Sequence, residues 1–400
     1  MLLFHSAKVR IVNSERAVTE CMEIAFGETI PSHSGVVIFH ATLGHKVDRV
    51  GAAIKQCMPG VTVVGNSCGA VTGREGVGES MNELSMMMFT GPKEEYAVAA
   101  VHDIYGHNSY EKGLVLAKSL NEKLGGINTI YLLCPGIDSA SDLVIQAFDE
   151  VFGSDVTLFG GTSSDNMQSL STYQYADDKL CEHSAWAVGF ADPTLKAVTR
   201  ATHGFAAYGE PMLVTKAQGN RIFELDGKQA WEVYKSNLSL TGADVRIADT
   251  VPIGALAEEL PKELAEEYGN PHILRAVSKF DETDGSLFYP TTCRQGLKLW
   301  LTTRDENLIF SEQQRSLNYL IDHKTDKEIV AVFQADCLAR GRALFNRIMK
   351  DEIIGMMHAS LSNAGEVPPW LGMYGSGEYA KLGGRNTFHN YTTALLVLYR

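Results

Sequence analysis

The strongest constraint on the fold is a strand–helix–strand pattern that occurs twice in the first half of the chain. In the first copy, residues 35–39 (GVVIF) have the composition of a buried strand. The stretch 44–57 (GHKVDRVGAAIKQC) follows with apolar residues along one helical face, and Pro59-Gly60 ends it. Residues 61–64 form the next predicted strand and run directly into the sequence GNSCG. Two strands joined through a helix in this way are expected to lie parallel in one sheet.

The second copy repeats this order and ends in a related glycine-rich loop. Residues 127–133 (INTIYLL) are a predicted strand, and SASDLVIQAFDEVFG is a predicted helix with Ser139 or Ser141 as its N-cap. A second strand then leads into GGTSSDN, so VTVVGNSCG and VTLFGGTSSD occupy the same place in the two copies. Further β-prone stretches, expected to pair antiparallel, follow in both copies and place His102 and His203 at equivalent positions.

The predicted fold class is therefore α/β (α+β). We expect a duplicated, βαβ-containing N-terminal domain with mixed sheets at residues 30–220, with its two copies at about 35–106 and 127–209. An α/β C-terminal domain is expected at residues 221–400, because further strand patterns and a long helical pattern follow there.

Composition restricts the classes of partner and the compartment. The chain has 400 residues and a net charge of −13, which argues against nucleic acid or an anionic membrane as the main partner. Its seven cysteines are scattered and form no CxxC pair, so we expect a reduced, cytoplasmic protein. No apolar run reaches the ~18 residues that a membrane span needs, so membrane insertion is not expected. The sequence leaves open whether two copies form a homodimer.

The sequence Gly65-Asn66-Ser67-Cys68-Gly69 matches G-x-S-x-G, the pattern of a serine-hydrolase nucleophile elbow. An elbow requires a strand before the serine and a helix after it, because the helix N-terminus supports the oxyanion hole. Here the glycine-rich stretch AVTGREGVGES follows and continues into another strand pattern. We therefore expect a protein that is not an enzyme.

The two glycine-rich loops are instead expected to form two walls of a ligand pocket, since loops at the carboxyl ends of parallel strands bind ligands in α/β folds. Tight turns that only let strands cross are the alternative. The ligand-binding candidates from the loops are Ser67, Cys68, Gly69, Gly161, Thr162, Ser163 and Asp165.

Polar residues in the second half add further candidates. Cys337 ends a buried-type strand, and Arg340 and Arg342 follow it closely. Nearby cations lower the pKa of a thiol and make it reactive, which is one interpretation of this cysteine. The other is a buried small hydrophobic residue, which is what most lone cysteines are. Glu378 lies in a Gly-Ser-Gly-Glu turn, where it could hold a ligand amine or fix the loop through backbone N–H groups. Arg385 could bind a carboxylate with two hydrogen bonds, or lie in solvent.

Several of these motifs resemble those of the FIST sensory proteins, which carry FIST N-terminal and C-terminal domains in tandem. The matching sequences are VVGNSCGAVTG, LFGGTSSDN, FELDGKQAWEVY, FQADCLARG and GMYGSGEYAKLGGRNTFHNYT. The resemblance covers the chain from about residue 30 to the end. Its most specific part is Gly377-Glu378 with His389-Asn390, which adds Asn390 to the ligand-binding candidates. The first half departs from the family at Ser67-Cys68, where its loop often carries a Ser-Thr pair.

The resemblance implies ligand sensing coupled to signalling. One branch of free-standing FIST proteins resembles haem-based nitric oxide sensors that act on a partner histidine kinase. This chain is similar in length, so the resemblance implies a non-catalytic, intracellular sensor that acts in trans on a histidine kinase. The implied cofactor is haem b, which needs one neutral imidazole in an apolar pocket. The iron-ligand candidates are, in order, His203, His358 and His389.

Two alternatives stay open. The first is a sensor of a small molecule such as an amino acid, without haem. The second is an enzyme that uses Cys337 or Ser67 as its nucleophile.

Overall fold

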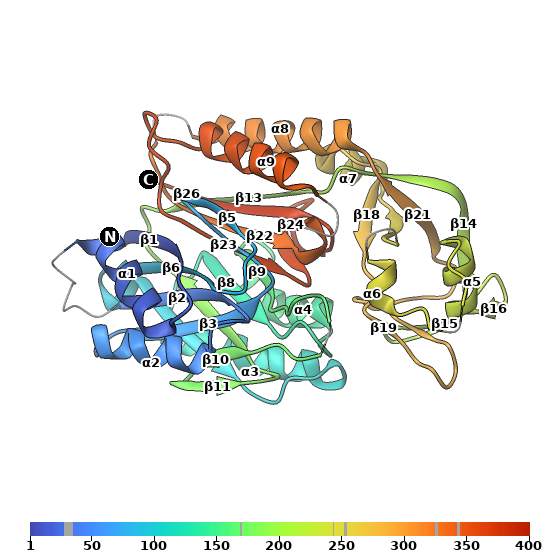
Figure 1. Cartoon of the computed structure of the whole chain (residues 1–400), viewed down its shortest axis with the longest axis horizontal. Coiled ribbons are helices and arrows are strands. Elements are labelled where there is room, and N and C mark those ends of the chain that lie inside the picture. The colour runs from blue at the N-terminus through green and yellow to red at the C-terminus, as the bar shows by residue number, and fades with distance from the viewer. Residues whose placement is uncertain (28–34, 169, 243, 252–253, 325–326, 342–344) are drawn as a thin grey trace.

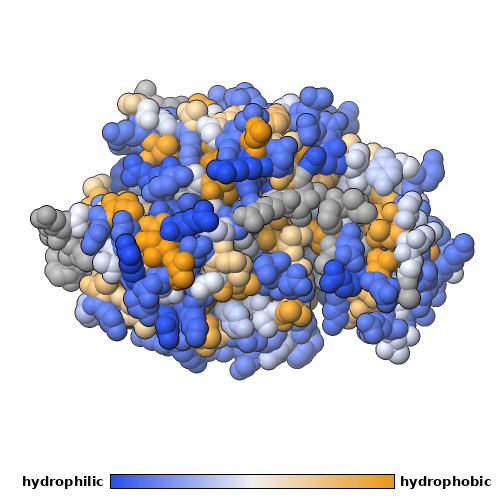
Figure 2. Space-filling model, viewed as in Figure 1, coloured by the Kyte–Doolittle hydropathy of each residue, from blue (hydrophilic) through white to orange (hydrophobic). Residues whose placement is uncertain are grey.

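A computed structural model describes residues 1–27, 35–168, 170–242, 244–251, 254–324, 327–341 and 345–400 (Figure 1). The polypeptide forms a body of three sheets with flanking helices, and a lobe, residues 205–304, that projects to one side of it. None of the described helices is long and apolar enough to cross a membrane. Figure 2 shows a mostly hydrophilic face with small hydrophobic groups scattered over it.

The three body sheets share one strand order. In each sheet a parallel pair lies in the middle, two antiparallel strands lie on one side of it, and a hairpin lies on the other. The first sheet has the order β1 (Leu3–Arg10), β6 (Glu83–Thr90), β2 (Gly35–Thr42), β3 (Thr62–Cys68), β10 (Gln174–Ala176) and β11 (Lys179–Cys181). The second has the order β7 (Tyr96–Val101), β12 (Ala185–Phe190), β8 (Thr129–Cys134), β9 (Thr157–Thr162), β24 (Glu378–Leu382) and β25 (Arg385–His389). The third has the order β13 (Lys196–Thr202), β26 (Thr393–Tyr399), β22 (Ile329–Cys337), β23 (Trp370–Gly375), β4 (Val71–Gly73) and β5 (Gly76–Gly78).

The two predicted strand–helix–strand units are present, and a third copy joins them, but the predicted bounds of the copies are wrong: β7, placed in the first copy, pairs in the second sheet, and β13, placed in the second copy, pairs in the third. The parallel pairs β2–β3 and β8–β9 flank the predicted helices α2 (Val47–Cys57) and α4 (Ser141–Phe152). The third pair, β22–β23, flanks α9 (Arg347–Ser360) in the same way. The sequence predicted the strand and the helix of this copy but not its equivalence to the first two.

The three copies exchange strands in a ring. Hairpin β4–β5 of the first copy completes the third sheet, β10–β11 of the second completes the first, and β24–β25 of the third completes the second. Each sheet therefore needs a hairpin from another copy, so a copy on its own would lack an edge of its sheet.

The hydrophobic core explains why the sequences of the central strands are continuous runs of apolar residues. The inner faces of the three sheets pack on one another through buried aromatic residues such as Tyr131, Trp186 and Phe333. The outer faces are covered by helix pairs, which are α1 (Ser14–Phe26) with α2, α3 (Ser109–Lys123) with α4, and α8 (Glu306–Asp322) with α9. Strands that are buried on both faces lack the alternation of apolar and polar residues that is typical of half-exposed strands.

The lobe is inserted between the second and third copies. Its sheet has the order β18 (His272–Arg275), β17 (Leu256–Glu259), β21 (Lys298–Arg304), β14 (Phe205–Gln218), β15 (Arg221–Leu225), β20 (Leu287–Phe288) and β19 (Lys279–Phe280), with β16 (Lys228–Gln229) paired to β15. Three short helices accompany it, α5 (Ala230–Asn237), α6 (Ile247–Thr250) and α7 (Lys262–Tyr268). The lobe has its own hydrophobic core around Trp231, Tyr234 and Tyr289.

The loops that follow the three parallel pairs meet at the centre of the body. The backbone N–H of Ser164 donates to Ser67 O at 3.2 Å, and that of Gly69 donates to Tyr374 O at 3.2 Å. The Ser164 hydroxyl also donates to Tyr374 O at 2.6 Å. The three copies are thus hydrogen-bonded to one another at their loops.

Glu378 fixes the end of β24 to the segment that precedes β26. The residue is completely buried, and its Oε2 accepts hydrogen bonds from the Thr392 hydroxyl at 2.7 Å and the Thr392 N–H at 3.2 Å. Its other oxygen, Oε1, has no partner among the described residues. Burial raises the pKa of this carboxyl well above its ordinary value of 4.5, and Asp336 adds to that shift.

We predict that Gly160→Ala destabilises the body by more than about 2 kcal/mol. Gly160 has φ +137°, and a Cβ there would lie 2.0 Å from Leu132 O. The control is Gly355→Ala in α9, where a Cβ would meet nothing within 4 Å. This control should raise the free energy of unfolding by up to about 1 kcal/mol, because alanine favours the helix. Urea denaturation measures both, and equal effects would contradict the prediction.

The buried carboxyl of Glu378 predicts a pH-dependent stability difference. A carboxyl with a raised folded pKa stabilises the fold below its unfolded pKa, and this stabilisation is lost as pH rises toward the folded pKa. Relative to Glu378→Gln, the free energy of unfolding of the wild type should therefore fall by up to about 1.4 kcal/mol per pH unit above pH ~4.5. Denaturation at several pH values tests this. The exposed Glu94→Gln control should differ from wild type by a constant amount, and a constant difference for Glu378→Gln would refute the prediction.

Candidate functional site

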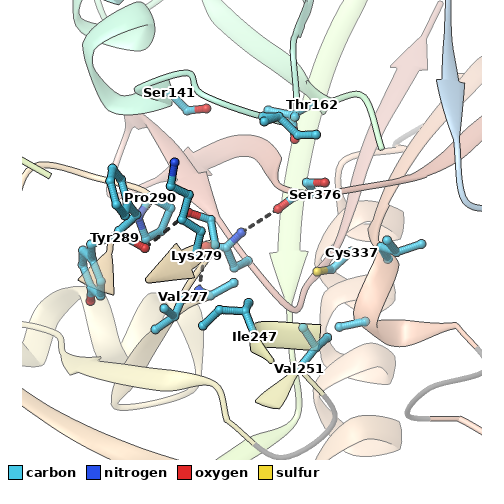
Figure 3. A pocket seen from close by; sticks show the side chains of 18 of the residues that line it. Ser141, Thr162, Ile247, Val251, Val277, Lys279, Tyr289, Pro290, Cys337 and Ser376 are labelled. Carbon is cyan, nitrogen blue, oxygen red and sulfur yellow. Dashed lines mark hydrogen bonds between the residues drawn. The ribbon is translucent and has the colours of Figure 1, made fainter. Parts of the chain in front are cut away.

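A cavity of about 220 Å³ lies between the body and the lobe, at the carboxyl ends of the parallel strands of the second and third copies (Figure 3). The body contributes both polar and apolar groups: the polar ones include Ser139, Ser141, Thr162, Ser376 and Asn390, and the apolar ones include Ile137, Met167, Cys337, Leu338 and Phe388. The lobe contributes mainly apolar groups, which are Ile247, Val251, Val277, Phe288, Tyr289 and Pro290, together with Asn220, Ser278 and Lys279. The cavity is therefore mixed in polarity, and it is smaller than the ~300–1,000 Å³ usual for drug-sized ligands.

Thr162 is a buried residue at the cavity. It ends β9 and is only 3% exposed, and its hydroxyl has no hydrogen-bond partner among the described residues. A buried hydroxyl without a partner costs free energy. The residue lines the cavity, but its hydroxyl oxygen is almost completely buried.

Asn390 joins the body to the lobe at the cavity wall. Its amide nitrogen donates to Ser376 O at 2.9 Å, and its oxygen accepts from Ala276 N, in the lobe, at 3.1 Å. The neighbouring Tyr391 hydroxyl donates to Val251 O, also in the lobe, at 3.0 Å. The predicted candidate Asn390 therefore holds the two parts together beside the cavity.

Cys337 lines the cavity, and its burial favours the alternative of a buried small hydrophobic residue over a reactive thiol. Burial raises the pKa of the Cys337 thiol well above its ordinary range, and nearby Glu378 adds to that shift. Arg340 acts in the opposite direction but is the weaker influence. The Arg340 guanidinium is itself buried, and it donates to His203 O at 2.9 Å and Tyr391 O at 3.3 Å. Arg342 lies outside the described residues.

Ser67, Cys68 and Gly69 do not line the cavity, because the first loop turns to the centre of the body. The Ser67 hydroxyl donates to Ser164 O at 3.0 Å and accepts from Tyr173 N at 2.9 Å, so both of its roles are taken. The next element is the strand β4, which confirms that no helix follows the G-x-S-x-G sequence. Burial raises the pKa of Cys68 far above its ordinary value.

In the second loop, three of the four candidates serve the structure. A Cβ on Gly161 would lie 2.4 Å from Gly377 O, so glycine allows β9 and β24 to pair there. The Ser163 hydroxyl accepts from Gly136 N at 3.1 Å and from Gln174 Nε2 at 2.8 Å. Asp165 accepts from the N–H groups of Gln168 and Leu170, which fixes the following turn. The two loops therefore contact each other but do not form two walls of one cavity.

The structure does not bring Glu378 and Arg385 into the cavity. Glu378 does not line the cavity and fixes the loop at Thr392, which is the second of its two predicted roles. Arg385 is exposed at the end of the β24–β25 hairpin.

None of the three histidine candidates is among the described residues that line the cavity. His203 and His389 both pack on the ring of Tyr268. His203 Nδ1 accepts from Phe205 N at 2.9 Å, and its Nε2 donates to His272 O at 3.0 Å. Burial lowers the pKa of His389 to about 3, and its Nε2 donates to Ala380 O at 3.3 Å. His358 packs edge-on against Trp370, and its buried Nε2 has no partner among the described residues.

Sequence reasoning missed the start of α4 and the lobe wall. The N-cap of α4 is Ala140, not Ser139 or Ser141, and no side chain caps the helix. Both serines line the cavity instead. The repeat pattern could have indicated Ser376, because it follows β23 as the glycine-rich loops follow β3 and β9. Val277 and Phe288 lie in or beside very short strands of the lobe, which give no periodic signal.

Comparisons with known proteins give two family matches. The FIST N domain matches residues 35–228 and the FIST C domain matches residues 230–381. Two curated relatives, uncharacterized proteins of Mycobacterium bovis and Mycobacterium tuberculosis, are each 21% identical over 243 residues, or 60% of this chain. The match spans only 59% of the length of these relatives.

Solved structures give only remote matches. A cyanuric acid hydrolase from A. caulinodans is 8% identical with a TM-score of 0.34, over 100% of this chain and 99% of its own. T. maritima PurL complexed with AMPPCP is 10% identical with a TM-score of 0.20, over 100% of this chain and 72% of its own. Matches at these scores indicate nothing about the chemistry of this chain. The two FIST matches cover most of the chain, so it belongs to the family of proteins that carry a FIST N domain followed by a FIST C domain, and these domains indicate a sensory role in signal transduction.

Proposed function

We propose that this protein is a non-catalytic, cytoplasmic sensor that binds a small molecule in the cavity between body and lobe and signals to a separate protein, such as a histidine kinase. The observation that carries the proposal is the cavity itself, which lies between the body and the lobe at the carboxyl ends of parallel strands, the place where α/β folds bind ligands.

The position of the cavity gives such a ligand a route to a conformational change. The lobe connects to the body through two chain crossings, at residues 203–205 and 304–306. Hydrogen bonds from Asn390 and Tyr391 also cross the boundary, and Asp142 accepts from the Thr292 N–H and hydroxyl at 2.7 Å each. A ligand that contacts both parts binds one position of the lobe more tightly than another. This difference in affinity shifts the equilibrium between the lobe positions that the partner protein encounters.

The residues present do not fit the haem-based form of this sensor. No histidine is among the described residues that line the cavity. His203 has both ring nitrogens engaged with backbone groups, so iron ligation there would break one of these bonds. His389 is completely buried between Tyr268 and Ala380 O. His358 Nε2 has no partner within the described part of the chain, but the ring packs edge-on against Trp370, outside the cavity. We therefore favour a ligand other than haem.

The enzyme alternative also has little support from the geometry. Nucleophilic catalysis needs a hydroxyl or thiol beside a general base. Ser67 is hydrogen-bonded only to backbone groups of Ser164 and Tyr173, and Cys337 has its pKa raised by burial.

We predict that Ser67→Ala removes no esterase activity and lowers the free energy of unfolding by about 1–3 kcal/mol, because two buried backbone groups lose a partner. Hydrolysis of p-nitrophenyl acetate and urea denaturation measure the two effects. The exposed Ser236→Ala control should change neither. A measurable esterase rate that falls by about 10³-fold or more in Ser67→Ala would restore the hydrolase hypothesis.

A substitution that fills the cavity should abolish sensing. Val277 is buried in the lobe wall, and tryptophan there would occupy the ligand volume. In a thermal-shift screen of a metabolite library, compounds that stabilise wild type should fail to stabilise Val277→Trp. The matched control is Val115→Trp on the surface of α3, where the side chain is 56% exposed, and it should respond like wild type.

Two outcomes would contradict the proposal. The first is a library in which no compound at millimolar concentration stabilises the wild type. The second is a set of compounds that stabilise Val277→Trp as well as wild type. Circular dichroism shows whether Val277→Trp folds, and Val251→Phe, at the same wall, replaces it if it does not.

A further inference from the structure

We propose that a groove between the first and second sheets binds an extended, apolar segment of a partner protein, which pairs with the free edge of β7 and carries an acidic residue beside Lys123. The groove has a volume of about 300 Å³. Among the described residues, it shares none with the lining of the cavity between body and lobe, so this inference does not rest on the proposed function.

The edge strand β7 forms one wall of the groove. Among the described strands, β12 alone pairs with β7, so the other edge of β7 is unpaired. Glu95 O accepts from Ala191 N where this pairing begins, so Glu95 faces β12. Residues of an antiparallel strand alternate in direction, and the N–H and C=O groups of Tyr96, Val98 and Ala100 therefore point away from β12. The side chains of the same residues are half-buried and line the groove, so this wall provides both the main-chain groups and the apolar row that an added strand requires.

The strand β3 forms the opposite wall, and part of its edge is unpaired as well. The strand β10 ends at Ala176, so Thr62–Val64 of β3 have no neighbour on this side among the described strands. Ser67 N donates to Tyr173 O, just before β10, and alternation along β3 directs the Val63 N–H to the same side. Val63 also lines the groove, so two unpaired strand edges form its opposite walls.

The equivalent positions in the other two copies have partners within the chain. Val63, Leu158 and Trp370 are equivalent, since each lies four residues before an N–H that bonds the residue preceding an exchanged hairpin. The Trp370 N–H donates to the Ser6 hydroxyl at 2.8 Å, and the Leu158 N–H donates to Asn386 Oδ1 at 3.0 Å. No described side chain accepts from the Val63 N–H, which faces the groove.

The three edge strands also differ at one matching position. The sheet registers place Ser6 of β1, Val98 of β7 and Thr199 of β13 in the same row of their sheets. The Ser6 hydroxyl bonds Trp370, and the Thr199 hydroxyl accepts from the Lys381 N–H at 3.1 Å. Val98 has no hydroxyl and lines the groove instead. The chain thus closes two of these equivalent junctions with its own polar groups, and the third has room for an added strand.

Charge at the groove restricts the segment that fits it. The acidic lining residues are paired within the chain, as in the Lys55–Asp178 ion pair at 3.0 Å. Lys123 has no carboxylate partner among the described residues, and its Nζ donates to the outward-facing Val98 O at 2.8 Å. An incoming N–H that bonds Val98 O would release this ammonium group to pair with a carboxylate. The groove is therefore complementary to an apolar strand with an acidic residue next to it.

Fluorescence anisotropy tests the assignment with the labelled peptide acetyl-Glu-Val-Thr-Val-Thr-Val-Glu. Its valines can face the apolar row, and a glutamate at each end provides a carboxylate for Lys123 in either strand direction. We expect saturable binding to the wild type below about 1 mM. Two further peptides carry N-methyl groups on every valine or on every threonine. At least one of them should bind about tenfold more weakly, because N-methylation removes the donors of one strand edge.

Variants of the protein test the two walls and the charge. Ala100→Trp fills the groove and should weaken binding at least about tenfold, whereas Val115→Trp on the surface of α3 should bind like wild type. Lys123→Met should weaken binding about threefold. Lys118→Met is its control, because Lys118 is exposed on the same helix and does not line the groove. Circular dichroism shows whether Ala100→Trp folds, and Val98→Phe replaces it if it does not.

The outcomes that overturn the proposal are distinct. Absence of saturable binding, equal affinity for all three peptides, or full affinity in Ala100→Trp would refute the strand site, and full affinity in Lys123→Met would refute the acidic residue. If the wild type sediments as a dimer and Ala100→Trp as a monomer, a second copy occupies the groove and the partner segment is wrong. Val277→Trp should bind the peptide like wild type, so failure at the groove leaves the sensor proposal intact.

Discussion

Hydrogen bonds among three loops at the centre of the body hold the architecture together. Ser67 and Gly69, Ser164, and Tyr374 come from three copies of one strand–helix–strand unit. The Ser164 N–H donates to Ser67 O, and Tyr374 O accepts from the Gly69 N–H and the Ser164 hydroxyl. Polar backbone buried at this depth must find partners, and here each loop finds them in its neighbours. The ring of exchanged hairpins and the shared aromatic core both require the loops to meet in this way.

The inserted lobe makes the three copies chemically unequal. The first loop packs into the centre, where the Ser67 hydroxyl is hydrogen-bonded both as donor and as acceptor. In the second copy, Thr162 and the start of α4 face the lobe instead, and the third copy adds Cys337 and Ser376 to the same cavity. A repeated framework thus supplies strand ends suited to ligands, while the insertion determines which of them form a closed, partly apolar site.

The sequence was sufficient for the fold class and for part of the site. The repeated VTVVGNSCG and VTLFGGTSSD patterns predicted two parallel pairs, and apolar periodicity placed α2 and α4 correctly. The third copy was not predicted, because its glycine-rich sequence GMYGSGE differs from the other two glycine-rich loops and lies beyond the lobe in the chain. Thr162 and Ser67 were both predicted as ligand-binding residues. Which of their two loops turns to the centre of the body depends on packing between the copies. The wall formed by Val277 and Phe288 depends on long-range pairing of very short strands, which local pattern does not reveal.

The exchange of strands between copies also has a consequence for synthesis of the chain. The hairpin β4–β5 pairs with β23, so Val71 meets Met373, and β13 pairs with β26, so Thr202 meets Thr393. Contacts so distant in sequence slow folding, because long loops must close before the pairing stabilises them. Until residues 329–399 have left the ribosome, a nascent chain displays unpaired β edges from its first two copies, which are the surfaces on which chains aggregate and which chaperones shield.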